Sequence, residues 1–325
     1  MSALASTAPA GALPIRITVR DERLVVDWLP LDTIAMPEPF FPQTIRRMRD
    51  DGAQYVTTGL DALAAFADSP VPVRTAFVFH VSHCGSTLVA NVLKTIPESF
   101  VLSEPALITV GGQLCSPYLT RVISREQHHA LIRGAIAAYA AAGGPKRYLF
   151  CKFTDVASLC LPLLRSLFPE VPFLFLYRDP RHVIASNLEI PEDIRRQWHA
   201  EVAALLGHEA HWAPPPARYF AEIFEAECVR AAITPNVIPL DYRDLSPERL
   251  LQLLPQLGVA PQDVDEAALR GQFRTYSKAL PSQAERFSAQ AEAARREAMA
   301  ACLDPAHCAG ALAAYERTGA TAAVA

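Results

Sequence analysis

The chain has 325 residues, of which 51% are hydrophobic and 20% are charged. This balance is typical of a globular protein with one large core, and it excludes a disordered or fibrous chain. The formal net charge of −4 does not provide the overall basic surface that a nucleic acid or an anionic membrane attracts. We therefore expect neither as a partner, and any anion-binding site must be local.

Seven cysteines are spread along the chain without a CxxC pair. An odd number without such pairing favours reduced thiols over a disulfide framework. Residues 1–13 lack the basic segment and the apolar run of a secretory signal, and no apolar stretch is long enough to cross a bilayer. The sequence therefore predicts a cytoplasmic protein.

The N-terminal part is predicted to hold a tail, a hairpin and a helix. Apolar and polar residues alternate over residues 15–29, which is typical of a β-hairpin. A helix candidate follows at residues 42–49, and the prolines of residues 70–72 punctuate the chain before the first buried strand. We therefore divide the chain into an N-terminal part, 1–70, and a main α/β domain, 71–325.

Short apolar runs alternate with helix signals throughout the main domain. The predicted strands lie at residues 76–81, 100–102, 147–153, 172–177 and 237–240. Between the second and third of these, Ser124 can cap a helix that Gly143 and Gly144 can end. Apolar strands separated by helices form a parallel sheet that is covered on both faces. The predicted fold class is therefore α/β, with a doubly wound parallel sheet.

Two further segments lie outside this alternation. Residues 195–233 have a helical pattern that is broken by Pro214, Pro215 and Pro216, which predicts a helical insertion beside the sheet. Beyond Ala309 the chain is rich in Ala, Gly and Thr, and we expect its last residues to be frayed.

The first chemically informative segment is the loop after the strand at residues 76–81. It reads Ser82-His83-Cys84-Gly85-Ser86-Thr87 and leads into a helix with an apolar face. Gly85 allows the backbone to approach a ligand, Ser86 and Thr87 supply hydroxyl groups, and the amides of the helix N-terminus converge on one point. Such a loop binds phosphate or sulfate without a large basic surface.

A second junction between a strand and a helix also carries a phosphate-binding pattern. Arg178 directly follows the strand at residues 172–177, and Asp179 and Pro180 suit the first positions of the following helix. Ser186 lies about two turns into that helix. A guanidinium group can donate two charge-assisted hydrogen bonds to a phosphate, and a hydroxyl adds a third donor. Both junctions lie at the carboxyl ends of parallel strands, where open α/β sheets bind ligands.

Together these motifs resemble those of the P-loop sulfotransferase superfamily. The first is similar to the family's 5′-phosphosulfate-binding loop, with His83 where the family usually has Lys or Arg. The second is similar to its 3′-phosphate motif, in which an Arg is followed eight residues later by a Ser, the spacing of Arg178 and Ser186. The resemblance covers about residues 74–244.

The resemblance implies transfer of a sulfonate group from 3′-phosphoadenosine 5′-phosphosulfate (PAPS) to a hydroxyl or amine acceptor, with release of 3′,5′-adenosine bisphosphate (PAP). The acceptor would be a small molecule or a peptide, and no metal is needed. Residues 82–87 would hold the phosphosulfate, and Arg178 with Ser186 would hold the 3′-phosphate. Lys278 lies in a basic cluster near the C-terminus that would fold over the cofactor, as a late basic loop does in this family; the cluster consists of Arg270, Arg274, Tyr276, Ser277 and Lys278.

Three side chains are candidates for the chemistry itself. Glu104, just after the second strand of the domain, is the hypothesised general base, and several branches of the family use a Glu there; its alternative role is a cap on the next helix. His83, if protonated, would assist the leaving oxygen. Lys152 ends the third strand, where it either reaches the site or extends its ammonium group to solvent.

Two other functions fit the same motifs. A P-loop kinase or other nucleotide phosphotransferase would explain both phosphate-binding turns, but His80 and Ser86 replace the first Gly and the Lys of GxxxxGK[ST]. A non-catalytic nucleotide-binding protein of the same fold would explain why His83 replaces the usual basic residue.

Overall fold

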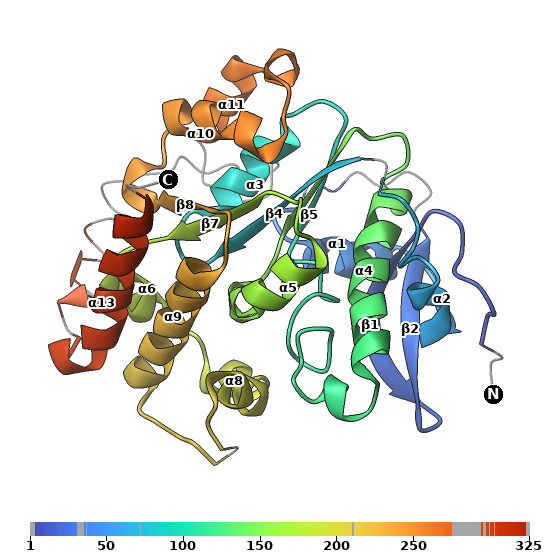
Figure 1. The fold of residues 1–325 in the computed structure, drawn as a ribbon, viewed down its shortest axis with the longest axis horizontal. Coiled ribbons are helices and arrows are strands. Elements are labelled where there is room, and N and C mark those ends of the chain that lie inside the picture. The colour runs from blue at the N-terminus through green and yellow to red at the C-terminus, as the bar shows by residue number, and fades with distance from the viewer. Residues whose placement is uncertain are drawn as a thin grey trace.

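The computed structural model describes residues 4–30, 36, 38–71, 73–209, 211–274, 294, 297–298, 300–301 and 303–322. It has an α/β fold with a large parallel sheet and a small antiparallel sheet (Figure 1). Within the described part of the chain, no helix is both long and apolar enough to cross a membrane.

The central sheet has five parallel strands in the order β5-β6-β4-β7-β8. Their bounds are Arg74–His80 for β4, Ser99–Ser103 for β5, Tyr148–Lys152 for β6, Phe173–Tyr177 for β7 and Val237–Asp241 for β8. All five predicted strands and their parallel arrangement are confirmed. Their carboxyl ends lie at one edge of the sheet.

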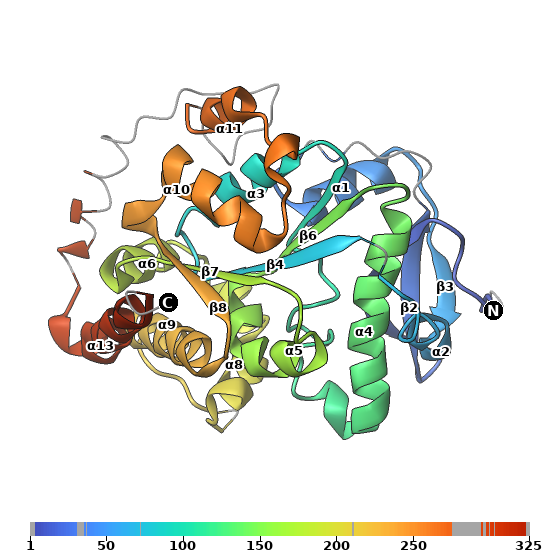
Figure 2. The ribbon, with the colours of Figure 1, turned by 45° about the horizontal axis from the view of Figure 1, so that its top comes forward.

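Helices cover both faces of this sheet, as predicted for a doubly wound fold. Figure 2 shows α3 (Ser86–Lys94), α10 (Pro247–Leu253) and α11 (Glu266–Gln272) on one face. The other face is covered by α5 (Leu161–Leu167) and α9 (Pro216–Ile233). Short 3₁₀ turns connect several elements, at Leu119–Arg121, Asp155–Cys160 (η2), Tyr242–Asp244, Leu254–Leu257 and Pro261–Asp263.

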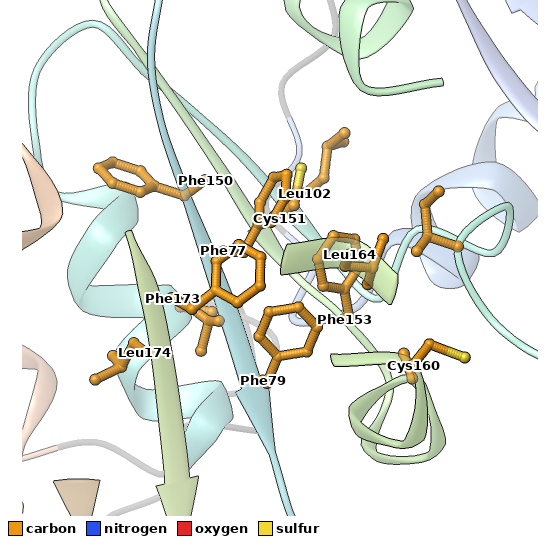
Figure 3. Close-up of a cluster of buried hydrophobic side chains, with 14 of the residues drawn as sticks. Phe77, Phe79, Leu102, Phe150, Cys151, Phe153, Cys160, Leu164, Phe173 and Leu174 are labelled. Atoms are coloured by element: carbon orange, nitrogen blue, oxygen red, sulfur yellow. The ribbon is translucent and has the colours of Figure 1, made fainter. Parts of the chain in front are cut away.

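Aromatic side chains fill the core beneath the central strand. Phe77 and Phe79 lie two positions apart on β4 and so point to the same face. They pack against Phe153 and Phe173, with ring centroids 5.0 to 5.4 Å apart (Figure 3). This packing fixes the strands whose ends carry the candidate site residues.

The N-terminal part forms a three-stranded antiparallel sheet of β1 (Ala12–Arg20), β2 (Arg23–Pro30) and β3 (Val56–Gly59). The predicted hairpin is confirmed, and its turn residues Asp21 and Glu22 both have positive φ, as a tight two-residue hairpin turn requires. The predicted helix is α1 (Phe41–Asp50), and a short helix, α2 (Leu60–Ala64), follows β3. The sequence pattern did not indicate β3, because four residues are too few to show an alternation.

The helix that follows Ser124 is also confirmed. It is α4 (Arg125–Ala142), whose first turn is capped by a hydrogen bond from the Gln127 amide to the Ser124 hydroxyl at 3.1 Å, and it ends at Gly143.

The predicted helical insertion is confirmed, although it begins slightly earlier than expected. It consists of α7 (Glu192–Arg196), α8 (His199–Leu206) and α9, and the chain is non-helical just before Pro216. Pro216 occupies the first turn of α9, where the missing amide hydrogen costs no helical bond.

The expectation of frayed last residues is wrong as far as Ala322, and residues 323–325 lie outside the described residues. Residues Pro305–Ala322 form helix α13, which packs along α9 (Figure 1). Cys308, Ala311 and Ala314 of α13 are buried, and Gly310 lies directly against Glu225 of α9, since small residues allow two helices to approach closely. The small residues that suggested fraying are therefore a packing surface.

Candidate functional site

The carboxyl edge of the central sheet brings most of the candidate residues together. The strand order changes direction at β4, because β5 and β6 lie on one side of it and β7 and β8 on the other. Ligands of open α/β sheets bind at such a point. The loop after β4 lies at the centre of this edge, with Glu104 and Lys152 on one side and Arg178 on the other.

The β4–α3 loop (residues 81–85) makes the tight turn that the sequence predicts. Gly85 has φ of 87°, and a Cβ atom there would lie 2.6 Å from Leu245 Cδ2, so a side chain at this position would force Leu245 to move. Ser86 and Thr87 are buried in the first turn of α3. Cys84 is fully buried, and burial raises the pKa of its thiol to about 12, so this side chain contributes packing rather than reactivity.

Side-chain hydrogen bonds join the two motifs into one site. The hydroxyl group of Ser82 lies 2.9 Å from Oδ1 and 2.7 Å from Nδ2 of Asn187. Asn187 ends α6 (Pro180–Asn187) and follows Ser186, which is itself buried. Arg178 Nη1 donates a hydrogen bond to the carbonyl oxygen of His83 at 3.3 Å. The loop and the β7–α6 junction therefore hold each other in place.

Arg178 is the most distinctive side chain of the site. It is only 8% exposed, and its guanidinium group lies over the ring of Tyr242, 4.0 Å from the ring centroid. Among the described residues, no carboxylate forms an ion pair with Arg178. Asp179 caps α6 and pairs with Arg181 at 2.6 Å instead. A desolvated guanidinium group without an acidic partner is suited to an anionic ligand.

Glu104 and Lys152 form an ion pair on the other side of the loop. Lys152 Nζ donates to Glu104 Oε1, and the Glu104 amide donates to the Lys152 carbonyl oxygen at 2.6 Å. Lys152 is 1% exposed, so the alternative in which it extends to solvent is wrong. Glu104 is three-quarters buried, has a positive φ of 62° and precedes a non-helical segment, so it caps no helix among the described residues. Unfavourable backbone of this kind is often found at functional sites.

A small cavity of about 50 Å³ lies beside the β4–α3 loop. Ser82 and Asn187 line it, together with two acidic residues that sequence reasoning missed. Asp155 begins η2, three residues after β6, and its carboxylate accepts a hydrogen bond from the Val156 amide at 2.9 Å. Glu227 lies on the buried stripe of α9, between Phe224 and Ala231. Glu227 could have been identified from the sequence, because it is an acidic residue within an apolar helical stripe.

Burial raises the pKa of both carboxyl groups. For Asp155 the effect of burial is increased by the negative charge of Glu104 and opposed by hydrogen bonds from the Val156 amide and Ser82. Glu227 is 2% exposed, and its Oε1 has no hydrogen-bond partner among the described residues. Burial, and to a lesser extent the charge of Asp155, raises the pKa of Glu227 well above its usual value, while Arg230 opposes the shift.

Glu227→Gln is expected to raise the free energy of unfolding at neutral pH. A carboxyl group whose pKa is higher in the folded state costs stability at every pH above its unfolded value of about 4.5, and glutamine removes this cost. The gain is at most about 3 kcal/mol at pH 7 and disappears near pH 4. Urea denaturation at both pH values measures it, with Glu225→Gln on the same helix as the control. Equal stability of Glu227→Gln and wild type at pH 7 would contradict the prediction.

Most of the basic cluster near the C-terminus lies outside the described residues. Tyr276, Ser277 and Lys278 lie outside the described residues. Arg270 of the same cluster lies on α11 and pairs with Glu248 at 2.5 Å. No group of three metal-ligating side chains occurs among the residues that the structure describes.

Comparisons with known proteins give little beyond this geometry. No family model matches the chain, and no curated protein matches it. Among solved structures, a sulfotransferase domain from the curacin biosynthetic pathway aligns with a TM-score of 0.39 and 16% sequence identity, over 64% of this chain and 80% of that domain. An alignment with so low a TM-score and identity does not indicate an activity.

Proposed function

We propose that the protein is a PAPS-dependent sulfotransferase, which transfers a sulfonate group to a hydroxyl or amine of a small-molecule or peptide acceptor. The observation that carries the proposal is the environment of Arg178. Its guanidinium group is nearly buried, contacts the β4–α3 loop and has no acidic partner among the described residues. A phosphate dianion next to this loop would supply the missing charge.

The two halves of PAPS would be held by different motifs. The amides at the start of α3, with the hydroxyl groups of Ser86 and Thr87, would bind the 5′-phosphosulfate. Arg178 and Ser186 would bind the 3′-phosphate, with Tyr242 supporting the guanidinium group. All these donors are neutral or cationic, which suits a ligand that carries several negative charges.

Transfer requires the acceptor atom to attack the sulfur in line while the bond between the sulfur and the bridging phosphate oxygen breaks. Glu104 is proposed to take the acceptor's proton through Oε2, since Lys152 pairs with Oε1 and holds the carboxylate in place. His83 is proposed to stabilise the charge on the leaving oxygen when protonated. The protein would supply positioning and electrostatics, and the bridging oxygen would leave on PAP.

Other features bear on the cellular setting and on the competing function. The six described cysteines are free thiols, which supports a reducing compartment such as the cytoplasm. A P-loop kinase is less well supported, because Ser86 is buried at the position of the phosphate-binding lysine.

Thermal denaturation with nucleotides tests the proposal. PAP is expected to raise the melting temperature, and ATP with Mg²⁺ is expected to leave it nearly unchanged. Stabilisation by ATP with Mg²⁺ in place of PAP would assign the protein to the kinases instead.

A further inference from the structure

The cavity beside the β4–α3 loop has an unusual combination of walls. Aromatic side chains from the helical insertion form much of its lining, among them Trp198, Tyr219 and Phe220. Two carboxyl groups, those of Asp155 and Glu227, face the same small space from different elements. An apolar cavity that contains two acids is costly to form, because each carboxylate loses its hydration.

Neither acid has a cationic partner in the part of the chain that the structure describes. Asp155 and Glu227 form no ion pair there, and Oε1 of Glu227 accepts no hydrogen bond. Of the nearby basic groups, Lys152 pairs with Glu104, and Arg230 donates to the carbonyl oxygens of Leu159 and Leu205. Arg195 lines the cavity but pairs with neither acid among the described residues, and its buried Nε has no hydrogen-bond partner there. A bound cation would therefore supply a positive charge to both acids and a hydrogen-bond donor to Oε1 of Glu227.

The size of the cavity restricts the type of cation. Its volume of about 50 Å³ is far below the roughly 300 to 1,000 Å³ of sites that hold whole organic ligands, so only a small head group would enter it. Among organic cationic groups an ammonium group needs the least room, and a divalent metal ion would need about six oxygen ligands. An ammonium group donates three hydrogen bonds, which matches Glu227, Asp155 and the Ser82 hydroxyl, and aromatic rings attract it further.

A second cavity lies next to the first and could hold the rest of a molecule that carries this ammonium group. It has a volume of about 450 Å³ and is lined by residues of α7, α8 and α9 and of the segment before α9, including Glu192, His199 and Pro214. Arg195 and Tyr219 line both cavities and so form their shared wall. This volume is within the range of sites for small organic ligands.

We propose that the inner cavity binds the ammonium group of an apolar primary amine, whose body extends past Arg195 and Tyr219 into the outer cavity. As the identity of the sulfonate acceptor, this inference rests on the proposed function. The binding site itself is inferred from the two acids, the aromatic side chains and the volumes of the two cavities.

Calorimetric titration of the full chain with 2-phenylethylamine and 2-phenylethanol tests the inference, since the two probes differ only in the head group. The amine is expected to bind at least about 10-fold more tightly than the alcohol. Glu227→Gln and Asp155→Asn are each expected to lower the amine affinity by about 10 to 100 fold and to leave the alcohol affinity unchanged. Glu225→Gln, on α9 but outside the cavity, should change neither.

Equal binding of the two probes, or amine binding that both variants leave intact, would overturn the inference. Titration of the same samples with PAP separates it from the proposed function. PAP binding without amine binding overturns the amine site alone. Amine binding without PAP binding supports the site and contradicts the sulfotransferase assignment. A PAP affinity equal to that of wild type also shows that each variant is folded.

Discussion

Arg178→Ala is expected to weaken PAP binding by about 10 to 150 fold. This range corresponds to the loss of charge-assisted hydrogen bonds worth roughly 1.5 to 3 kcal/mol. Arg178 is nearly buried and lies over Tyr242, so little of its charge is screened by solvent, and alanine cannot replace its donors. Isothermal titration calorimetry of the variant and the wild type with PAP measures the effect.

Two further variants serve as comparisons for the effect of Arg178→Ala on PAP affinity. Arg181→Ala removes a guanidinium group from the same segment, but that group is 54% exposed and pairs with Asp179, so PAP affinity should stay within about 2-fold of wild type. Ser186→Ala should cost less than Arg178→Ala, because it removes one neutral donor. Unchanged affinity in a folded Arg178→Ala variant would place the 3′-phosphate elsewhere.

Glu104→Gln is expected to lower turnover by about 10² to 10⁴ fold and to leave PAP affinity nearly unchanged. Glutamine keeps the shape of the side chain but cannot accept the acceptor's proton, and this range is the usual contribution of a positioned base. Single-turnover release of PAP from PAPS, with the amine or alcohol that the protein accepts, measures the loss.

The ion pair with Lys152 requires a control for folding. Removing the charge of Glu104 leaves a buried ammonium group unpaired, which can cost about 3 kcal/mol or more of the free energy of unfolding. The double variant Glu104→Gln/Lys152→Met removes this cost and should be equally inactive. Wild-type turnover of Glu104→Gln would transfer the role of base to Asp155, the other carboxyl group near this end of β6.

Most of the fold could be predicted from the sequence, because the patterns that indicate its strands and helix ends are local. Buried parallel strands are continuous apolar runs, and the start of α6 is marked by Asp179 and Pro180, each at the position that its chemistry favours. The same locality explains the errors. The strand β3 has too few residues to show an alternating pattern. The small residues of α13 can be recognised as a packing surface only when the helix is seen next to α9.

The site was only partly readable, because much of it depends on which strands and helices become neighbours. Arg178 and the β4–α3 loop follow apolar strands and could be identified from their motifs. The pairing of Glu104 with Lys152 depends on β5 lying next to β6, which residue patterns do not reveal. The meeting of Asp155 with Glu227 likewise depends on α9 packing against η2.

Calorimetric titration of the wild-type chain with PAP and with ADP tests directly whether the protein recognises a 3′-phosphate. The two nucleotides carry the same number of phosphates, but only PAP has one at the 3′ position, where Arg178 and Ser186 are proposed to bind. We expect PAP to bind at least about 10-fold more tightly than ADP. We also expect PAP at about 100 times its dissociation constant to add about 2.7 kcal/mol to the free energy of unfolding. Equal affinity for the two nucleotides, or no binding of PAP, would contradict the assignment.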